Sequence, residues 1–226
     1  MVTYNLHGCV GTDGVRDPRR VARVICDLEP DIAGLQEVDC RTRLADGRSQ
    51  LDVIAEATGM SAIPGPTMTM GGGFFGNAVL TRFPVTDVKH FDLSFRRREP
   101  RAILAATVAI GGLHLRCFVT HFGLRGQERS HQVRLLLDHV GSEPVVLMGD
   151  FNEWRPRTTT IADLDAALGR APAVRSFPSR LPLLKLDRIW VRPVGALLDI
   201  EPHGGALARA ASDHLPVLAR LDKRKL

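Results

Sequence analysis

The chain has 226 residues, of which 44% are hydrophobic and 24% charged, and this composition is typical of a soluble globular domain. No apolar run approaches the ~20 residues of a membrane-spanning helix, and the first residues lack the basic-then-apolar pattern of a signal peptide. A single cytoplasmic domain over residues 1–226 is therefore expected, without stable membrane insertion or an obligate protein partner. The net charge of +5 favours polyanionic partners.

The four cysteines are Cys9, Cys26, Cys40 and Cys117, and no two of them form a CxxC pair. This spacing argues against a structural zinc site and against a disulfide framework. Reduced thiols are expected, some of them buried.

The first 60 residues alternate strand and helix patterns. Val2 to Leu6 is predicted as a strand, and Ile32 to Gln36 as a second strand that ends at Glu37. Between them, Asp17 can cap a helix that has proline at its first position and apolar residues at helical spacing. A second helix is expected from Leu51 to Thr58, ended by a glycine.

The middle of the chain is dominated by strand patterns. Residues 60 to 76 are rich in Pro, Met and Gly and are predicted to be a long irregular loop. Ala78 to Leu80 follows as a short strand. Ile103 to Ile110 and Leu113 to Thr120 are predicted to form a hairpin, because Gly111-Gly112 between them is a tight-turn signal.

The last third continues the alternation. A helix is expected around Val133 to Val140, then the buried strand Val145 to Met148, and then a helix through Ile161 and Leu168. Further strands are predicted at Leu186 to Val191, at Ala196 to Ile200 and within Leu215 to Leu221. Strands and helices in this mixture predict mixed sheets flanked by helices, an α/β (α+β) fold.

Polar side chains stand at the ends of these strands. Asp150 and Asn152 follow the buried strand, and they share a face if the extended backbone continues past Gly149. A carboxylate there suits a metal ion or a phosphate reaction, and a polar turn is the alternative. Similar residues end or border the other strands: Asn5, Glu37, Asn77, Arg101, His121, Asp187, Asp213 and His214.

The segments around these residues resemble motifs of the endonuclease/exonuclease/phosphatase superfamily, which includes the deoxyribonuclease I-like enzymes. They occur in the family's order: Thr3-Tyr4-Asn5-Leu6-His7-Gly8, Leu35-Gln36-Glu37-Val38, Gly76-Asn77-Ala78-Val79-Leu80, Thr120-His121, Gly149-Asp150-Phe151-Asn152, Leu186-Asp187-Arg188-Ile189 and Ser212-Asp213-His214. The resemblance implies a four-layer αββα sandwich of two mixed sheets flanked by helices. It also implies a hydrolase that cleaves phosphate esters with Mg²⁺ or Mn²⁺.

Mg²⁺ prefers hard oxygen ligands and needs only one or two protein carboxylates. Glu37 is the first candidate ligand, and Asn5 is expected to add its amide oxygen. The resemblance places Asp213 near the same ion. Bound there, the metal would polarise the phosphoryl oxygen and offset charge on the leaving oxygen.

For the attack on phosphorus, His214 is the candidate base, because imidazole titrates near neutral pH, and Asp187 is expected to orient it. Asp150 is expected to orient the attacking water or to assist proton transfer. Asn152 can donate a hydrogen bond to the phosphoryl oxygens. The resemblance assigns His121 a contact with the phosphate or the leaving group. Further candidates are Asn77, to position His121, and Arg101, to meet a phosphate.

The substrate stays open at this point. A phosphodiesterase acting on nucleic acid is favoured; the alternatives are a lipid headgroup or a small phosphorylated molecule, and an inactive family member that acts as a binding module. The cluster Arg96-Arg97-Arg98 suits a polyanion, although such clusters are usually only solvated. Trp154 could stack on a substrate or could pack in the structure.

Overall fold

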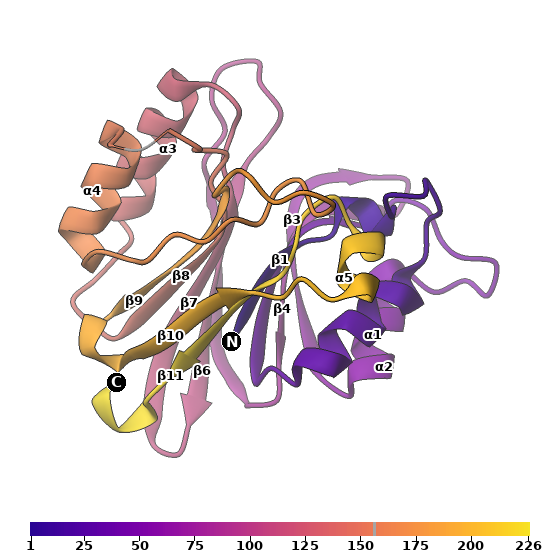
Figure 1. The fold of residues 1–226 in the computed structure, drawn as a ribbon, viewed down its shortest axis with the longest axis horizontal. Coiled ribbons are helices and arrows are strands. Elements are labelled where there is room, and N and C mark those ends of the chain that lie inside the picture. The colour runs from indigo at the N-terminus through magenta and orange to yellow at the C-terminus, as the bar shows by residue number, and fades with distance from the viewer. Residues whose placement is uncertain (156) are drawn as a thin grey trace.

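Two β-sheets stacked face to face form the centre of the molecule in the computed structural model, which describes residues 1–155 and 157–226 (Figure 1). The first sheet has six strands, in the spatial order β10 (Leu197–Pro202), β11 (Val217–Leu221), β1 (Val2–Asn5), β2 (Ile32–Asp39), β4 (Gly73–Thr81) and β3 (Ser61–Met70). The second has five, in the order β5 (Val85–Asp92), β6 (Ala102–Ile110), β7 (Leu113–His121), β8 (Val145–Asp150) and β9 (Asp187–Arg192). Each sheet contains parallel and antiparallel neighbours.

Helices cover the outer face of each sheet, as Figure 1 shows. The six-stranded sheet carries α1 (Pro18–Leu28), α2 (Gln50–Thr58) and α5 (Ala206–Ala211), and the five-stranded sheet carries α3 (Gly126–Leu137) and α4 (Thr159–Leu168). Three apolar clusters fill the spaces between the four layers: one lies between the sheets, and one lies under each helix layer. The predicted four-layer αββα sandwich is confirmed.

The first two helices begin and end close to where the sequence predicts, whereas α3, expected around Val133 to Val140, begins at Gly126 and ends at Leu137. The Asp17 side chain accepts a hydrogen bond from the backbone nitrogen of Arg20, and Pro18 opens α1. Ser49 and Asp52 form a reciprocal capping box at the start of α2. Gly59 ends α2 in the left-handed conformation, with φ of 64°.

The predicted loop over residues 60 to 76 is wrong. This segment contains β3 and the first part of β4, so the strand predicted at Ala78 to Leu80 begins at Gly73. Pro64 and Pro66 are tolerated because β3 is an edge strand, where an absent N–H need not break a ladder. Gly76 pairs with Pro66 and comes close to the preceding residue: a Cβ on Gly76 would lie 2.3 Å from the Gly65 carbonyl oxygen.

Two further elements have no counterpart in the predicted set. One is β5, an exposed edge strand without a hydrophobic run, and the other is α5, a single short helical segment. The four thiols are free, as expected, and three of them are buried: Cys9, Cys40 and Cys117. Among the described residues, no helix combines the length and the apolar character needed to cross a membrane.

Candidate active site

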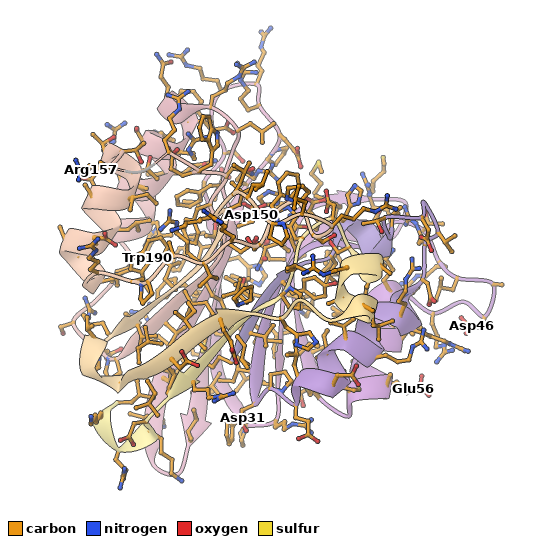
Figure 2. All side chains as sticks on the ribbon, viewed as in Figure 1. Asp31, Asp46, Glu56, Asp150, Arg157 and Trp190 are labelled. Atoms are coloured by element: carbon orange, nitrogen blue, oxygen red, sulfur yellow. The ribbon has the colours of Figure 1, made fainter. Side chains whose placement is uncertain are left out.

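Three neighbouring strands of the five-stranded sheet place His121, Asp150 and Asp187 in one row. β7 and β8 are parallel, with His121 opposite Asp150, and β8 and β9 are antiparallel, with Asp150 opposite Asp187. All three side chains are buried. Asp150 lies where the two sheets meet, near the centre of Figure 2.

The six-stranded sheet contributes Asn5 and Glu37 to the same place. Asn5 ends β1, and its Nδ2 donates to Oε1 of Glu37 at 2.9 Å and to Oδ2 of Asp150 at 3.1 Å. The pairing of β2 with β4 shifts register between Leu35 and Val38, and Glu37 has a φ of 55°. This bulge turns the Glu37 carboxylate towards Asn5.

His214 joins the group from the loop between α5 and β11. Its Nδ1 donates to Oδ2 of Asp187 at 2.8 Å, and its Nε2 lies 3.7 Å from Oδ2 of Asp150. The imidazole is therefore held between two carboxylates, one on each nitrogen, and its orientation is fixed. The ring of Phe177 packs against it, with 4.8 Å between ring centroids.

His121 has a different environment on the other side of Asp150. The Asn152 amide nitrogen donates to its Nε2 at 3.0 Å and also to the Phe122 carbonyl oxygen at 2.9 Å. Nη1 of Arg101 lies 3.4 Å from its Nδ1. The structure thus brings His121, Asn152 and Arg101 together.

The pKa values of the two imidazoles are shifted in opposite directions. Burial lowers the pKa of His121 to about 3, although the Asp150 charge opposes this, so His121 is neutral at physiological pH. Burial would also lower the pKa of His214, but Asp187 and Asp150 outweigh it and raise that pKa to about 10. In this arrangement His214 is an imidazolium at neutral pH.

Glu37 is also perturbed. Burial, and to a smaller extent the charge of Asp150, raises the pKa of Glu37 above its ordinary value, while the Asn5 hydrogen bond opposes the rise. A carboxylate in such a position is stabilised by any cation that binds beside it. The surroundings of Glu37 therefore favour the binding of a cation.

The donor set fits a divalent cation of the Mg²⁺ or Mn²⁺ class, because carboxylate oxygens converge there and no thiolate does. One atom each of Asp150, Asp187 and His214 lie within 4.8 Å of one another, and Oδ1 of Asp187 is buried without a partner among the described residues. However, Asp187 and His214 already bind each other, and a metal on His214 Nδ1 would have to break that bond. Glu37 accepts one hydrogen bond, from Asn5 at Oε1, and each Asp150 oxygen also accepts one, from Asn5 at Oδ2 and from the Asn152 backbone at Oδ1, so a carboxylate oxygen can turn to a cation without breaking a His–Asp pair.

Asn5 differs from the expectation in its orientation. Its amide nitrogen faces the two carboxylates, and its Oδ1 accepts a hydrogen bond from the backbone nitrogen of His7 at 3.0 Å. To offer that oxygen to a metal, the amide would have to rotate and give up this hydrogen bond. In the structure Asn5 holds Glu37 and Asp150 together.

Two other candidates lie at the margin of the group. The Asp213 side chain is 38% exposed, and its Oδ1 lies 3.8 Å from Nδ1 of His7. Asn77 is buried in β4 and donates to the Ala102 carbonyl oxygen at 3.1 Å, which ties the two sheets together; the described residues show no hydrogen bond from it to His121.

The backbone past Gly149 does not stay extended, so Asp150 and Asn152 do not share a strand face. Asn152 has a φ of 49°, and its backbone nitrogen donates to Oδ1 of Asp150 at 2.9 Å. The segment is therefore the polar turn that the alternative interpretation describes, and it also brings both side chains to the site.

Sequence reasoning missed two buried serines that support the site. Oγ of Ser176 donates to Oδ2 of Asp187. Oγ of Ser212 donates to the Asn5 carbonyl oxygen at 2.8 Å and accepts from the His214 backbone nitrogen at 3.2 Å. Ser212 lies inside a motif next to His214, whereas Ser176 lies in a loop without any periodic signal.

A model of the endonuclease/exonuclease/phosphatase family matches residues 2–214, nearly the whole chain. The chain belongs to this family. The protein named uncharacterized protein YbhP of Escherichia coli strain K12 is 35% identical over 164 residues. That match covers 66% of this chain and 63% of YbhP, so the chain spans less than two thirds of this relative's length.

Solved structures of family members show the same fold. An endonuclease/exonuclease/phosphatase from Bacteroides vulgatus superposes with a TM-score of 0.80 at 20% identity and covers 98% of both chains. The mannosyl-6-phosphatase Bt3783 of Bacteroides thetaiotaomicron gives 0.79 at 20% identity, also covering 98% of both chains. A family member from Beutenbergia cavernae gives 0.75 at 24% identity and covers 97% of this chain and 70% of that one.

Proposed function

We propose that this protein is a metal-dependent phosphoric ester hydrolase that cleaves phosphodiester bonds, with nucleic acid as its favoured substrate. Family membership supports the reaction class. The observation that carries the proposal is the position of Asp150: its Oδ2 lies 3.1 Å from the Asn5 amide and 3.7 Å from the His214 imidazole that Asp187 orients. Asp150 therefore lies between the proposed cation site, near Asn5, and the protonated imidazole of His214.

Mg²⁺ or Mn²⁺ would be held by Glu37 and Asp150, with Asp213 at the exposed margin. Asn5 would act as the positioning residue that keeps the first two carboxylates together. Bound there, the cation would supply a Lewis acid that polarises a phosphoryl oxygen and offsets charge on the leaving oxygen.

Asp150 and His214 would have different roles in the reaction. We propose that Asp150 accepts the proton of the attacking water, because it is an anion that lies between the two sides of the site. His214, as an imidazolium oriented by Asp187, would neutralise a charged phosphoryl oxygen. This proposal gives His214 a role other than the expected base, because Asp187, Asp150 and Asp213 raise its pKa.

His121 and Asn152 would serve the other phosphoryl oxygens. A neutral imidazole and a carboxamide can donate hydrogen bonds without adding a charge that the site must compensate. The Asn152 amide donates to His121 Nε2 and to the Phe122 carbonyl oxygen, so it would exchange its bond with His121 for one to a phosphoryl oxygen. The Arg101 guanidinium behind His121 is buried and paired with Glu99 at 2.9 Å, which suits a positioning role for it better than direct contact with a phosphate.

The loop between β5 and β6 supports a polyanionic substrate. A cavity of about 400 Å³ there is lined by Phe95, Arg96 and Arg98 together with Arg125 at the start of α3. These arginines are exposed and lie in the chain shortly before Arg101 and shortly after His121. Such an arrangement would track a nucleic-acid backbone, and binding to it falls steeply with added salt.

The test is a panel of plasmid DNA, single-stranded RNA, bis-p-nitrophenyl phosphate and p-nitrophenyl phosphate, each with and without Mg²⁺. We expect Mg²⁺-dependent cleavage of the diesters, absent in Asp150→Ala, with nucleic-acid cleavage that weakens as salt rises. Turnover of the monoester alone would identify a phosphatase of small molecules instead. No Mg²⁺-dependent turnover on any member of the panel would contradict the proposal and favour a binding module.

A further inference from the structure

Arg188 is a buried cation that the proposed chemistry does not use. It follows Asp187 in β9, so its side chain leaves the opposite face of the sheet, away from His214 and towards the layer of α3 and α4. It is 6% exposed. Within residues 1–155 and 157–226, no carboxylate forms a salt bridge with it, and its Nε is buried without a hydrogen-bond partner.

The nearest acids are engaged elsewhere. Oδ1 of Asp165 accepts the indole N–H of Trp190 at 2.8 Å. Oε2 of Glu153 accepts from Nη2 of Arg129 at 2.8 Å, in a buried pair of its own. The remaining contact of the Arg188 guanidinium is with the Trp190 ring, whose centroid lies 5.9 Å away. A charge buried in this way is costly unless something compensates it.

Arg188 lies on the wall of a large open cavity of about 970 Å³ between α4, the segment 170–175 and the start of β9. Four more cations line it, all of them exposed, so they surround its mouth while Arg188 lies deeper: Arg157, Arg170, Arg175 and Lys185. Asp165 is the one acid among the described lining residues. Figure 2 shows Arg157 on the α4 side of the molecule, apart from Asp150.

The same cavity has an apolar wall. Ile161 and Pro172 line one part of it, and Leu183 and Trp154 line the rim. Leu183 is 57% exposed and Trp154 54% exposed, so both present apolar surface at the rim. Trp154 therefore does not pack in the core, contrary to one of its two interpretations; the Arg155 guanidinium lies 5.3 Å from its ring centroid, and a ligand could stack on the exposed part of the ring.

We propose that this cavity is a second anion site, separate from the catalytic group, which binds a phosphate-bearing ligand with an apolar or ring-shaped part. The phosphate lies against Arg188, with Arg175 and Lys185 at the mouth. A guanidinium offers paired N–H donors that match phosphate oxygens. The apolar part lies along Ile161 and against Trp154, as aromatic rings stack on an exposed indole.

The phosphate can come from a free small molecule or from one nucleotide of a longer strand. This site is separate from the proposed active site, and its test measures binding rather than catalysis. The two can therefore fail independently.

The chain contains two tryptophans: Trp154 is exposed at the rim, and Trp190 is fully buried against Arg188, so comparison of the wild type with Trp154→Phe isolates the signal of Trp154. The experiment titrates inorganic phosphate, phenyl phosphate and a short oligothymidylate into the full chain in EDTA and follows tryptophan emission excited at 295 nm. EDTA keeps the metal-dependent group from contributing.

We expect saturable quenching by phenyl phosphate, tighter than with inorganic phosphate, and loss of that signal in Trp154→Phe. Arg188→Met should weaken phenyl phosphate binding about tenfold or more, since a hydrogen bond to a charged group is lost. If Arg188→Met misfolds, Arg175→Gln replaces it, and the exposed Arg220→Gln on β11 is the matched control that should bind as the wild type does. If the oligothymidylate displaces phenyl phosphate, the site binds a phosphate of a nucleic-acid strand. If it does not, the site binds a free small molecule.

Thermal unfolding in EDTA gives a second readout. Phenyl phosphate should raise the Tm of the wild type and leave that of Arg188→Met unchanged. The proposal is overturned if none of the three probes changes the Trp154 emission, or if Arg188→Met and Arg175→Gln bind phenyl phosphate as tightly as the wild type.

Discussion

Nδ1 of His214 donates to Oδ2 of Asp187 at 2.8 Å, and this single contact decides that Nε2 is the nitrogen facing Asp150. Asp187 begins β9 of the five-stranded sheet, and His214, 27 positions later, lies in the loop that leads into β11 of the six-stranded sheet, so the hydrogen bond ties that loop to the other sheet. Because Asp187 is fully buried, its charge acts on the imidazole with little screening. The pair therefore links two parts of the fold and also stabilises the protonated form of His214.

Asp187→Asn should keep the hydrogen-bonded geometry but remove the charge that holds the His214 proton. We expect the pKa of His214 to fall and kcat on bis-p-nitrophenyl phosphate to drop by about 10²–10⁴-fold, by analogy with other Asp–His pairs. NMR titration of the imidazole and steady-state kinetics measure the two effects. Asp199→Asn, at an exposed position on β10, is the matched control and should change neither.

His214→Ala and Asp150→Ala should each abolish turnover while the protein stays folded. Asp150 lies at the end of β8 and His214 in the loop before β11, and neither belongs to the three apolar clusters, so the core remains intact. Circular dichroism and urea unfolding report the fold, and a diester assay reports the activity. Either variant with a near-wild-type rate would show that the assigned roles are wrong.

Glu37→Gln should raise the Mg²⁺ concentration needed for half-maximal activity, since the first candidate ligand loses its charge while keeping its shape. A metal titration of the rate measures this. Glu56→Gln in α2 removes an equally sized charge from an exposed position and should leave the titration unchanged. If Glu37→Gln gives the wild-type curve, Glu37 is not a ligand.

The pH dependence of metal binding follows from Glu37. Its pKa is raised above the ordinary value, so a bound cation has to displace a proton at a higher pH than it would from an unperturbed carboxyl group. Mg²⁺ affinity should therefore increase as the pH rises through the raised pKa of Glu37, with proton uptake by the buffer during titration calorimetry. In Glu37→Gln this pH dependence should be smaller; an identical dependence would point to another group.

The metal-free protein should lose stability as the solution becomes alkaline. His214 has a pKa of about 10 in the folded protein against 6.5 as the ordinary value, so the folded state binds the proton more tightly. That contribution is complete below about pH 6.5 and disappears as the pH rises through about 10. Urea midpoints in EDTA across this window should fall in the wild type more than in His214→Gln.

Two buried arginines in the same layer provide a matched pair for stability. Arg129 is paired with the buried Glu153, so Arg129→Met leaves an uncompensated buried carboxylate and should cost about 3–5 kcal/mol. Arg188 has no such partner among the described residues, so Arg188→Met should be neutral or stabilising in the absence of ligand. Urea unfolding of both variants measures the difference, and equal losses would show that Arg188 is compensated after all.

The sequence by itself determined the layers and most of the element boundaries. Periodic apolar residues and local caps act within a few neighbours, so α1 with Asp17 and α2 with Ser49 could be predicted from the chain alone. The β3 and β4 hairpin could not, because prolines and glycines read locally as a loop. These residues fit a strand there because β3 lies at the edge of its sheet and because Gly76, without a side chain, can approach the Gly65 backbone closely.

The identity of the site residues also came from the sequence, through motifs that end buried strands, but their partnerships were decided by tertiary structure. Only the pairing of β7, β8 and β9 aligns His121, Asp150 and Asp187, and only the packing of the two sheets brings Asn5 to Asp150. Protonation follows from that packing as well: two histidines with the same intrinsic chemistry have pKa values of about 3 and about 10, because burial dominates at His121 although Asp150 lies 3.5 Å away, whereas Asp187 and Asp150 outweigh burial at His214. Such differences depend on three-dimensional distances and on exclusion of water, which no local pattern of residues encodes.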